Sequence, residues 1–223
     1  MLYIVSTPIG NLKDITLRAI ETLKKVDLIA AEDTRHTRIL TKEYDIDTPL
    51  TSYFEHNKLK KADSILKGLK QGKNIALVTD AGTPGISDPG FHLIRLAQQH
   101  DIPMTVIPGP AAVIAGLTLS GLPCHRFVFE GFLPVKPSAR RKKLEEMKEE
   151  KGTMVFYESP YRLMKALRDI KDVLGDPLVV CTREITKKFE EVKRGSASDL
   201  MKHFSAGKVR GEIVLLVNLS IVD

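Results

Sequence analysis

Acidic side chains that could accept a proton follow two apolar runs in the first half of the chain. Glu32 and Asp33 follow "LIAA", and Asp80 follows "IALVT". Three basic or imidazole side chains come next after the first pair: Arg35, His36 and Arg38. A carboxylate can orient or deprotonate a hydroxyl group, and an arginine can hold a phosphate. The plain alternative is a helix start in which Asp33 or Thr34 is the N-cap and the other charges are solvated.

Glycine and proline gather in three segments, each directly after an expected strand. The segments are "STPIGN", "TDAGTPGISDPG" and "PGPAA". Glycine lets a backbone approach a ligand closely, and proline holds a loop without an N–H to satisfy. One such segment is typical of a tight turn, but three at one sheet edge favour a shared pocket. None matches the nucleotide-binding patterns G-x-G-x-x-G or G-x-x-x-x-G-K-[ST], so a loop that binds phosphate groups is disfavoured. The loops instead suit an adenosine-type ligand that is held mostly by main-chain groups.

A basic segment, "KPSARRKK", opens a highly charged stretch in the second half of the chain. It contributes five cations: Lys136, Arg140, Arg141, Lys142 and Lys143. A solvated helix start would explain it, because the acids of "LEEMKEE" follow at i,i+4 spacing. The bases nevertheless come first, which is the unfavourable order for the helix dipole, and this favours an RNA-binding loop. "SYFEHNK" adds Tyr53, Phe54 and His56, aromatic rings that could stack on a base, although Phe54 is equally suited to a core.

The elements that must position these residues alternate between strand and helix. Expected strands cover 2–7, 27–32, 74–80 and 103–108, and expected helices cover 16–26, 61–72, 90–100 and 111–121, the first opened by Thr16 as N-cap. This alternation predicts an α/β fold with a mostly parallel sheet covered on both faces. The rhythm changes near residue 118, which predicts two domains, 1–117 and 118–223. The second then opens with a strand in "SGLPCHRFVFEGFLP" that leads into Pro134. It continues with strands at 153–158, 177–185 and 211–220, helices at 159–175 and 196–205, and a charged stretch at 186–195.

Composition limits the class of protein. The chain has 223 residues, 43% of them apolar, which is enough for a real core. No apolar run reaches membrane-spanning length and no basic region precedes the apolar start, so we expect a cytoplasmic protein without a membrane segment. Two cysteines, Cys124 and Cys181, give neither a disulfide framework nor a zinc spacing, and we expect no metal site. The net charge of +6 suits a polyanionic partner.

The motifs, taken in order, resemble one known family. "VSTPIGNLKDIT", "AAEDTRHT", "LVTDAGTPGISDPG", "IPGPAAVIAGLTLSGLP", "FEGFLP", "REITKKFEE" and "GEIVLLV" are similar to the ribosomal RNA small subunit methyltransferase I family, which has a tetrapyrrole-methylase-like fold. The similarity runs from residue 3 to about 217. Relatives that bind tetrapyrroles usually carry Gly-Asp-Pro in the long loop where this chain has "GTP", and this departure favours the rRNA branch.

The resemblance implies fold, activity and partners. It implies two α/β domains with S-adenosylmethionine held in the cleft between them, and methyl transfer to the ribose 2′-hydroxyl of a cytidine in the decoding region of 16S rRNA. It also implies a homodimer. Because a nucleotide buried in a folded RNA is recognised by shape as much as by its base, we expect the acceptor to be the assembled 30S subunit, with free 16S rRNA as the open alternative. The residues expected to contact the donor are Pro8, Ile9, Asp80, Thr83, Ile86, Ser87, Ala111, Ala112, Tyr157 and Glu212, the last through its backbone.

The resemblance leaves the catalyst and the acceptor open. Because the sulfonium donor is highly activated, in-line positioning supplies much of the acceleration and a base need only accept the proton late. Asp33, Asp80 and Glu32 are the candidates, unranked, with His36 and His56 as alternatives by type. Arg35 and His36 join the basic segment as expected RNA contacts. A small-molecule tetrapyrrole methylase and a non-catalytic RNA-binding protein are the competing hypotheses.

Overall fold

The computed structural model describes residues 1–220, apart from the side chains of Lys58 and Lys60. The chain divides into two compact units, Met1–Ala111 and Ala112–Asp223. The boundary expected from the sequence, between residues 117 and 118, falls inside helix α5 (Ala112–Ser120). That helix packs on the sheet of the second unit, so the structural division lies at its start.

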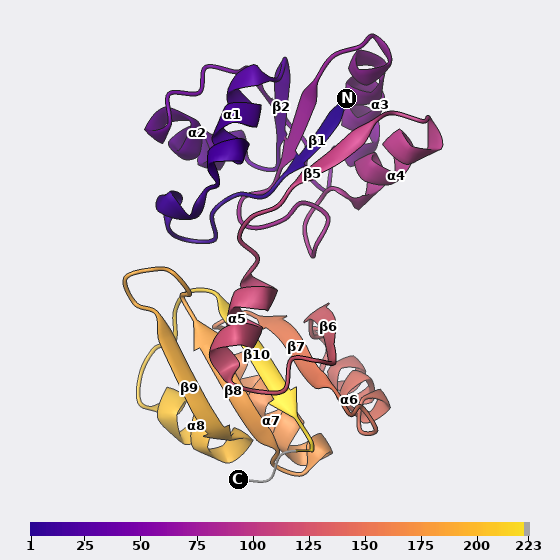
Figure 1. Cartoon of the computed structure of the whole chain (residues 1–223). Coiled ribbons are helices and arrows are strands. Elements are labelled where there is room, and N and C mark those ends of the chain that lie inside the picture. The colour runs from indigo at the N-terminus through magenta and orange to yellow at the C-terminus, as the bar shows by residue number, and fades with distance from the viewer. Residues whose placement is uncertain (221–223) are drawn as a thin grey trace. The chain divides into compact units, whose positions relative to one another are not determined.

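The first unit is built on a five-stranded parallel sheet (Figure 1). Its strands are β1 (Leu2–Val5), β2 (Leu28–Ala31), β3 (Leu50–Ser52), β4 (Ile75–Val78) and β5 (Met104–Ile107), in the order β3-β2-β4-β1-β5. All neighbouring pairs are parallel. The parallel sheet expected for this half is therefore present, and the short strand β3 is an addition that the sequence analysis did not predict.

Helices cover both faces of this sheet. They are α1 (Leu17–Lys25), α2 (Thr34–Glu43), α3 (Lys58–Lys70) and α4 (Phe91–Gln99), with a short 3-10 turn at Leu12–Asp14. The expected cap at Thr16 is present, because its hydroxyl accepts a hydrogen bond from Ala19 N. Leu23 of α1 and Leu40 of α2 share one buried cluster, and Ile65 of α3 and Leu93 of α4 share another. Each face of the sheet therefore has its own core.

The strand order creates a crevice between β1 and β4. The connections that follow β1 and β2 step toward one edge of the sheet, and those that follow β3 and β4 step toward the other. The helix after β1 and the helix after β4 consequently lie on opposite faces, and their loops diverge at the carboxyl ends of two neighbouring strands. In open α/β sheets, this switch point is where ligands bind.

The second unit has a mixed sheet, which the sequence analysis did not predict. Its strands are β6 (Phe127–Phe132), β7 (Thr153–Glu158), β8 (Leu178–Arg183), β9 (Glu191–Ser196) and β10 (Ile213–Asn218), in the order β6-β7-β10-β8-β9. Only the β6–β7 pair is parallel, and the other three pairs are antiparallel. Strand β9 begins inside the charged stretch 186–195, where an apolar pattern is lacking, and ends at Ser196.

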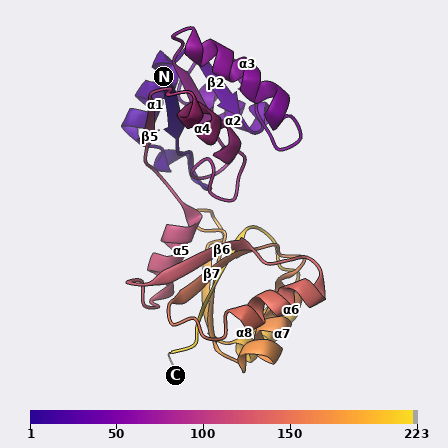
Figure 2. The ribbon, with the colours of Figure 1, turned by 90° about the vertical axis from the view of Figure 1, so that its right-hand side faces the viewer.

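Three helices cover one face of this sheet and α5 lies on the other (Figures 1 and 2). The three are α6 (Pro137–Glu146), α7 (Leu163–Leu174) and α8 (Ala197–Ser205), whose buried side chains join one core cluster. Gly116 lets α5 approach the opposite face closely. A Cβ at that position would lie 3.1 Å from Thr182 Oγ1 and 3.1 Å from a methyl of Val214.

Candidate functional site

The loop after β1 and the loop after β4 are joined across the switch point of the first unit. Thr7 N donates to Gly82 O at 2.9 Å, and Gly82 N donates to Thr7 O at 3.1 Å. The hydroxyls of Ser6 and Thr83 are 2.9 Å apart and share a hydrogen bond. Two of the three glycine and proline segments therefore form one continuous main-chain surface.

The third segment, after β5, lies beside the same surface. A Cβ at Gly109 would lie 3.0 Å from Ser6 Cβ, and a Cβ at Gly82 would lie 3.8 Å from Pro110 O and 3.7 Å from a methyl of Ile9. A larger residue at position 109 would press on the loop after β1. The structure thus brings all three segments together, as a shared pocket requires.

The long loop keeps its shape through backbone conformations that favour glycine. Gly82, Gly85 and Ser87 have positive φ angles of 87°, 86° and 65°. A Cβ at Gly90 would lie only 2.7 Å from Gly85 N, closer than side chains approach backbone. Glycine is therefore favoured at positions 82, 85 and 90 by the fold of this loop, whereas Ser87 adopts its positive φ with a side chain.

The three candidate carboxylates lie together at the carboxyl ends of β2 and β4. Glu32 Oε2 accepts hydrogen bonds from Thr79 Oγ1 and from Asp80 N, the latter at 3.2 Å. Asp33 N donates to Asp80 Oδ1 at 3.0 Å. These bonds connect residues that are 47 and 48 positions apart in the sequence. Because β2 and β4 are hydrogen-bonded neighbours, the acids after them meet.

The environments of Asp33 and Asp80 shift their pKa values in opposite directions. Asp33 is the N-cap of α2 and accepts hydrogen bonds from the Arg35 guanidinium, which lower its pKa from 3.8 to about 2. Burial raises the pKa of Asp80, and the nearby charge of Glu32 adds to that rise. Asp80 is consequently the better proton acceptor of the two near neutral pH.

Polar residues that the sequence analysis did not single out complete this region. Thr7 Oγ1 donates to Thr79 O at 3.0 Å, so the two loops are also joined beneath their bridge. Thr79 in turn holds Glu32. The signal in the sequence was a hydroxyl residue at the end of each apolar run, "VST" and "LVT". Within residues 1–220, no group of three or more His, Cys, Asp or Glu side chains is arranged to hold a metal ion.

The residues expected to contact a methyl donor fall into two groups. Seven lie in the loops just described: Pro8, Ile9, Asp80, Thr83, Ile86, Ser87 and Ala111. The other three belong to the second unit: Ala112, Tyr157 and Glu212. Ala112 begins α5, and Tyr157 packs edge-on against Phe129 and Phe132 with ring centroids 4.9 and 5.7 Å away. The backbone N–H and C=O of Glu212 both bond to Glu184, so they already have partners within their own unit.

The structure corrects the expected role of Arg140. Its side chain is 3% exposed, and both Nε and Nη2 lie 2.7 Å from Asp169 Oδ2 on α7. Its Nη1 donates to the carbonyls of residues 134 and 135. An arginine enclosed in this way is a structural ion pair and cannot contact RNA. The acids that balance the first turn of α6 come from α7, which sequence spacing does not show.

The other expected RNA contacts have mixed surroundings. Arg141 is half exposed and pairs with Asp169 and Asp172, and Lys143 pairs with Glu130 at 2.7 Å. Arg35 pairs with Asp33 and is exposed. Exposed side chains without such a pair belong to His36, Lys136 and Lys142. These three are the members of the expected set that are open to a polyanion among the described residues.

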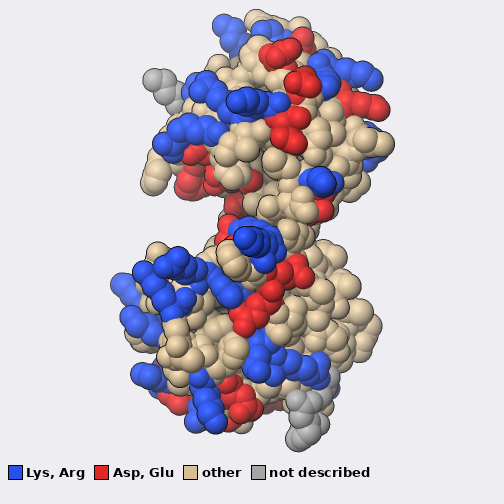
Figure 3. All heavy atoms as spheres, turned by 90° about the vertical axis from the view of Figure 1, so that its left-hand side faces the viewer, with Lys and Arg blue, Asp and Glu red and all other residues tan. Residues whose placement is uncertain are grey.

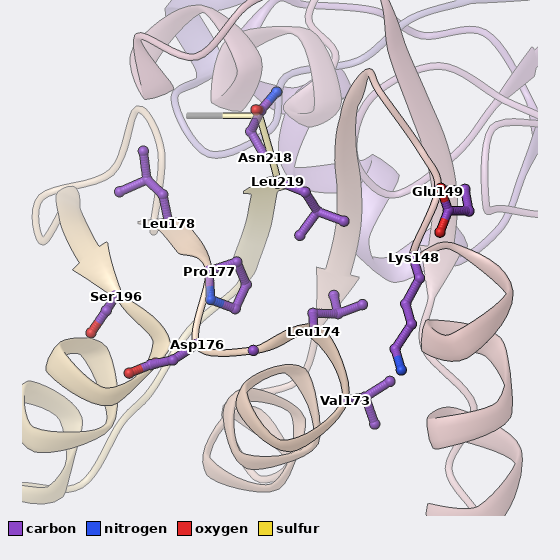
Figure 4. A pocket seen from close by; sticks show the side chains of 11 residues that line it. Lys148, Glu149, Val173, Leu174, Asp176, Pro177, Leu178, Ser196, Asn218 and Leu219 are labelled. Carbon is purple, nitrogen blue, oxygen red and sulfur yellow. The ribbon is translucent and has the colours of Figure 1, made fainter. Parts of the chain in front are cut away.

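A cavity of about 610 Å³ lies elsewhere, at one end of the second sheet (Figure 4). Figure 4 shows Leu174, Pro177 and Leu219 beside it, with Lys148 and Glu149 from the chain after α6. None of the residues singled out from the sequence lines this cavity. The three joined loops of the first unit therefore stay the candidate site.

Comparison with known proteins decides the family. The sequence profile of the Tetrapyrrole (Corrin/Porphyrin) Methylases matches residues 1–201. "Ribosomal RNA small subunit methyltransferase I" of Haemophilus influenzae is 48% identical over 220 residues, which cover 97% of this chain and 78% of the relative. The protein of the same name from Thermotoga maritima is 46% identical over 217 residues, covering 97% of both.

The chain belongs to the ribosomal RNA small subunit methyltransferase I family, within the tetrapyrrole methylases. The resemblance seen in the sequence motifs is thereby confirmed, as is the enzyme class, a methyltransferase that uses S-adenosylmethionine. The three loops fit such a donor, because they offer main chain and small side chains at the switch point and no phosphate cradle. Pro8 and Ile9 are buried beneath the loop surface, whereas Ile86 and Ser87 are exposed on it.

Solved structures of the same fold confirm the expected fold class. Uroporphyrin-III-C-methyltransferase from Thermus thermophilus aligns with a TM-score of 0.68 at 17% identity, covering 98% of this chain and 94% of that one. The methyltransferase CobJ aligns with a TM-score of 0.73 at 18% identity, covering 98% and 94%. At these identities, the likeness concerns the fold alone. No helix among residues 1–220 is long and apolar enough to cross a membrane.

Proposed function

We propose that this methyltransferase modifies 16S rRNA, transferring a methyl group to the ribose 2′-hydroxyl of a cytidine in the decoding region. The observation that carries the proposal is near-complete coverage of the chain, at 46–48% identity, by relatives named for a small-subunit rRNA methyltransferase. The acceptor is the assembled 30S subunit, the enzyme acts as a homodimer, and it works in the cytoplasm.

The donor supplies a sulfonium methyl group that is highly activated toward a nucleophile. The chain holds it against the joined loops of the first unit, through Thr83, Ile86, Ser87 and Ala111, while the buried Pro8 and Ile9 support the loop surface from beneath. A ribose hydroxyl is a poor nucleophile, so alignment of its oxygen with the methyl group supplies much of the acceleration. The rigid, bridged loops favour such alignment because their backbone is fixed by reciprocal hydrogen bonds.

Asp80 accepts the proton that the ribose hydroxyl loses as its oxygen bonds to the methyl group. Its Oδ1 already accepts from Asp33 N, so we assign the proton to Oδ2. Burial keeps the pKa of Asp80 above its usual value, which suits a group that must gain a proton during the reaction. Glu32 positions Asp80 by accepting from its backbone N–H. Asp33 holds the guanidinium of Arg35 in an exposed ion pair, so among the expected RNA contacts in this region His36 is the one left open to an RNA phosphate.

Transfer of labelled methyl from S-adenosylmethionine to unmodified 30S subunits tests this function, followed by mapping of the modified nucleotide. The expected product is one 2′-O-methylated cytidine in the decoding region. Free 16S rRNA serves as the comparison acceptor. Weaker methyl transfer to free rRNA than to 30S subunits would support the assembled particle as the substrate. Donor binding by calorimetry without transfer to either acceptor would overturn the rRNA assignment while leaving the methyltransferase class intact.

A further inference from the structure

The loop between β8 and β9, residues 184–190, has a strained backbone that hydrogen bonds and ion pairs hold in place. Glu184 and Thr186 have positive φ angles of 52° and 67°, although neither is glycine. Such conformations cost free energy and persist only where their surroundings enforce them. The segment belongs to "REITKKFEE", a motif to which the proposed methyl transfer assigns no role.

A charged clamp enforces this backbone. Glu184 Oε1 accepts from Lys187 Nζ and from Glu212 N, each at 3.0 Å. Lys187 Nζ also lies 2.6 Å from Glu212 Oε2, so one ammonium joins two carboxylates. Gly211 leaves the space for this arrangement, because a Cβ there would collide with the Glu184 carboxylate. The loop after β8 is thereby fixed to the loop before β10.

The clamp presents an exposed aromatic ring with a cation over it. Phe189 is 66% exposed, and Lys188 Nζ lies 5.7 Å from its ring centroid. The adjoining loop carries Lys208 and Arg210, and Arg183 Nη1 donates to the Arg210 carbonyl at 3.1 Å. None of Lys188, Lys208 and Arg210 has a carboxylate partner within the described part of the chain.

Cations prevail on this side of the second unit. Figure 3 looks onto the side that carries β9 and α8, where Lys and Arg side chains gather in patches. Three acids near the loop pair with cations: Glu184 and Glu212 with Lys187, and Glu191 with Arg183 and His203. The fourth, Glu190, is exposed and accepts a hydrogen bond from Thr186 N at 2.6 Å, so it sets one negative charge against the three cations Lys188, Lys208 and Arg210. The charge left over is positive, which favours a polyanion over a second copy of this basic chain.

We propose that the β8–β9 loop is a preorganised contact for single-stranded RNA, in which Phe189 stacks on an unpaired base. Lys188, Lys208 and Arg210 neutralise the phosphates beside that base. Lys187 and Glu184 are positioning residues that hold the loop in its binding conformation. This proposal rests on the rRNA substrate proposed above and names a part of the chain that grips it. Exposed aromatic rings beside cations are the usual means of holding unpaired nucleotides.

Steady-state methylation of unmodified 30S subunits tests the contact through Phe189→Ala and Lys188→Ala. We expect Phe189→Ala to raise KM for the subunit about 5- to 100-fold while kcat changes little, because stacking stabilises bound substrate and transition state alike. Phe189→Tyr keeps the ring and should restore KM. Lys188→Ala should reduce the slope of log affinity against log salt by about 0.7–1.

Matched controls come from the opposite end of the same sheet. Phe127→Ala removes a ring that is 39% exposed at the start of β6, and Lys148→Ala removes an exposed cation after α6. Neither should change KM or the salt slope. Lys187→Met breaks the clamp but leaves the Phe189 ring in place. It should raise KM for the subunit without changing the Kd of S-adenosylmethionine, and Lys187→Arg should rescue it in part.

The outcomes separate the loop from the enzyme's function. If the unaltered enzyme methylates 30S subunits and Phe189→Ala keeps the wild-type KM, the loop assignment is wrong and the function stands. If the unaltered enzyme methylates no rRNA, the proposed function itself fails. If Phe189→Ala changes the sedimentation coefficient of the protein instead of KM, the ring belongs to a contact between copies of the chain, and the RNA proposal is overturned.

Discussion

Arg140 and Arg141 are neighbours in sequence, yet the structure predicts opposite consequences for their removal. Arg140 is 3% exposed and Asp169 is 7% exposed, with two contacts of 2.7 Å between them. Arg141 is 49% exposed and reaches the other oxygen of the same carboxylate. Breaking a buried pair leaves one charge without compensation, whereas an exposed pair is screened by water.

The magnitude follows from these surroundings. Loss of one partner from a buried pair costs about 3–5 kcal/mol of unfolding free energy. In Arg140→Ala, Asp169 keeps Arg141 as a partner, so we expect the lower end, about 3 kcal/mol. For a chain of this length, that corresponds to a fall in Tm of about 6–12 °C. Arg141→Ala should cost no more than about 1 kcal/mol.

Thermal and urea unfolding followed by circular dichroism measures both variants. A double change, Arg140→Met with Asp169→Leu, serves as the control, because apolar residues of similar size can replace a buried pair with little loss. We expect it to be more stable than Arg140→Ala. If Arg140→Ala and Arg141→Ala unfold within about 0.5 kcal/mol of each other, the buried-pair reasoning is refuted.

Three further predictions concern the first unit. Asp80→Asn should lower the single-turnover rate of methyl transfer about 10²- to 10⁴-fold. Because Asp80 must be ionised to accept a proton, the kcat of the unaltered enzyme should rise with pH through a pKa above 3.8, and a flat pH–rate profile would contradict this. Asp33→Asn keeps an N-cap but removes the negative charge. The ionised Asp33 carboxylate stabilises the folded protein above pH 3.8, and this contribution is lost as the pH falls toward about 2. Urea unfolding at several pH values should show that the variant lacks this pH-dependent part of the unfolding free energy. Gly90→Ala should destabilise the first unit by about 1–3 kcal/mol and weaken donor binding, as measured by calorimetry, because the added methyl group would lie against Gly85 N. The control is Gly207→Ala, whose methyl group would meet no atom within 4 Å, and it should leave stability and donor binding unchanged.

The predictions around Arg140 also change how RNA binding should be tested. A loss of methylation in a variant that lacks both Arg140 and Arg141 would follow from unfolding as easily as from lost RNA contacts. Lys136 and Lys142 are exposed and have no such buried role. Variants at these two positions therefore probe the basic segment without disturbing the α6–α7 contact.

Much of the first unit could be predicted from the sequence, because its determinants are local. Apolar runs of four residues alternate with amphipathic helices, and Thr16 caps α1 through its own side chain. Glycine and proline mark the loops after β1, β4 and β5. The acids Glu32 and Asp80 each follow a strand, and parallel strands place such residues at one edge of the sheet.

Tertiary structure decided what depends on partners distant in the chain. The sequence shows four cations in "ARRKK" as equals, but α7 brings Asp169 to Arg140 and makes it a buried residue. Strand β9 has no apolar pattern and exists because β8 pairs with it at the sheet edge. The raised pKa of Asp80 likewise arises from burial in the folded unit, whereas the lowered pKa of Asp33 comes from Arg35, only two residues away in the chain. Residue type and spacing determine which groups are present, whereas packing determines which of them meet water, a charge or each other.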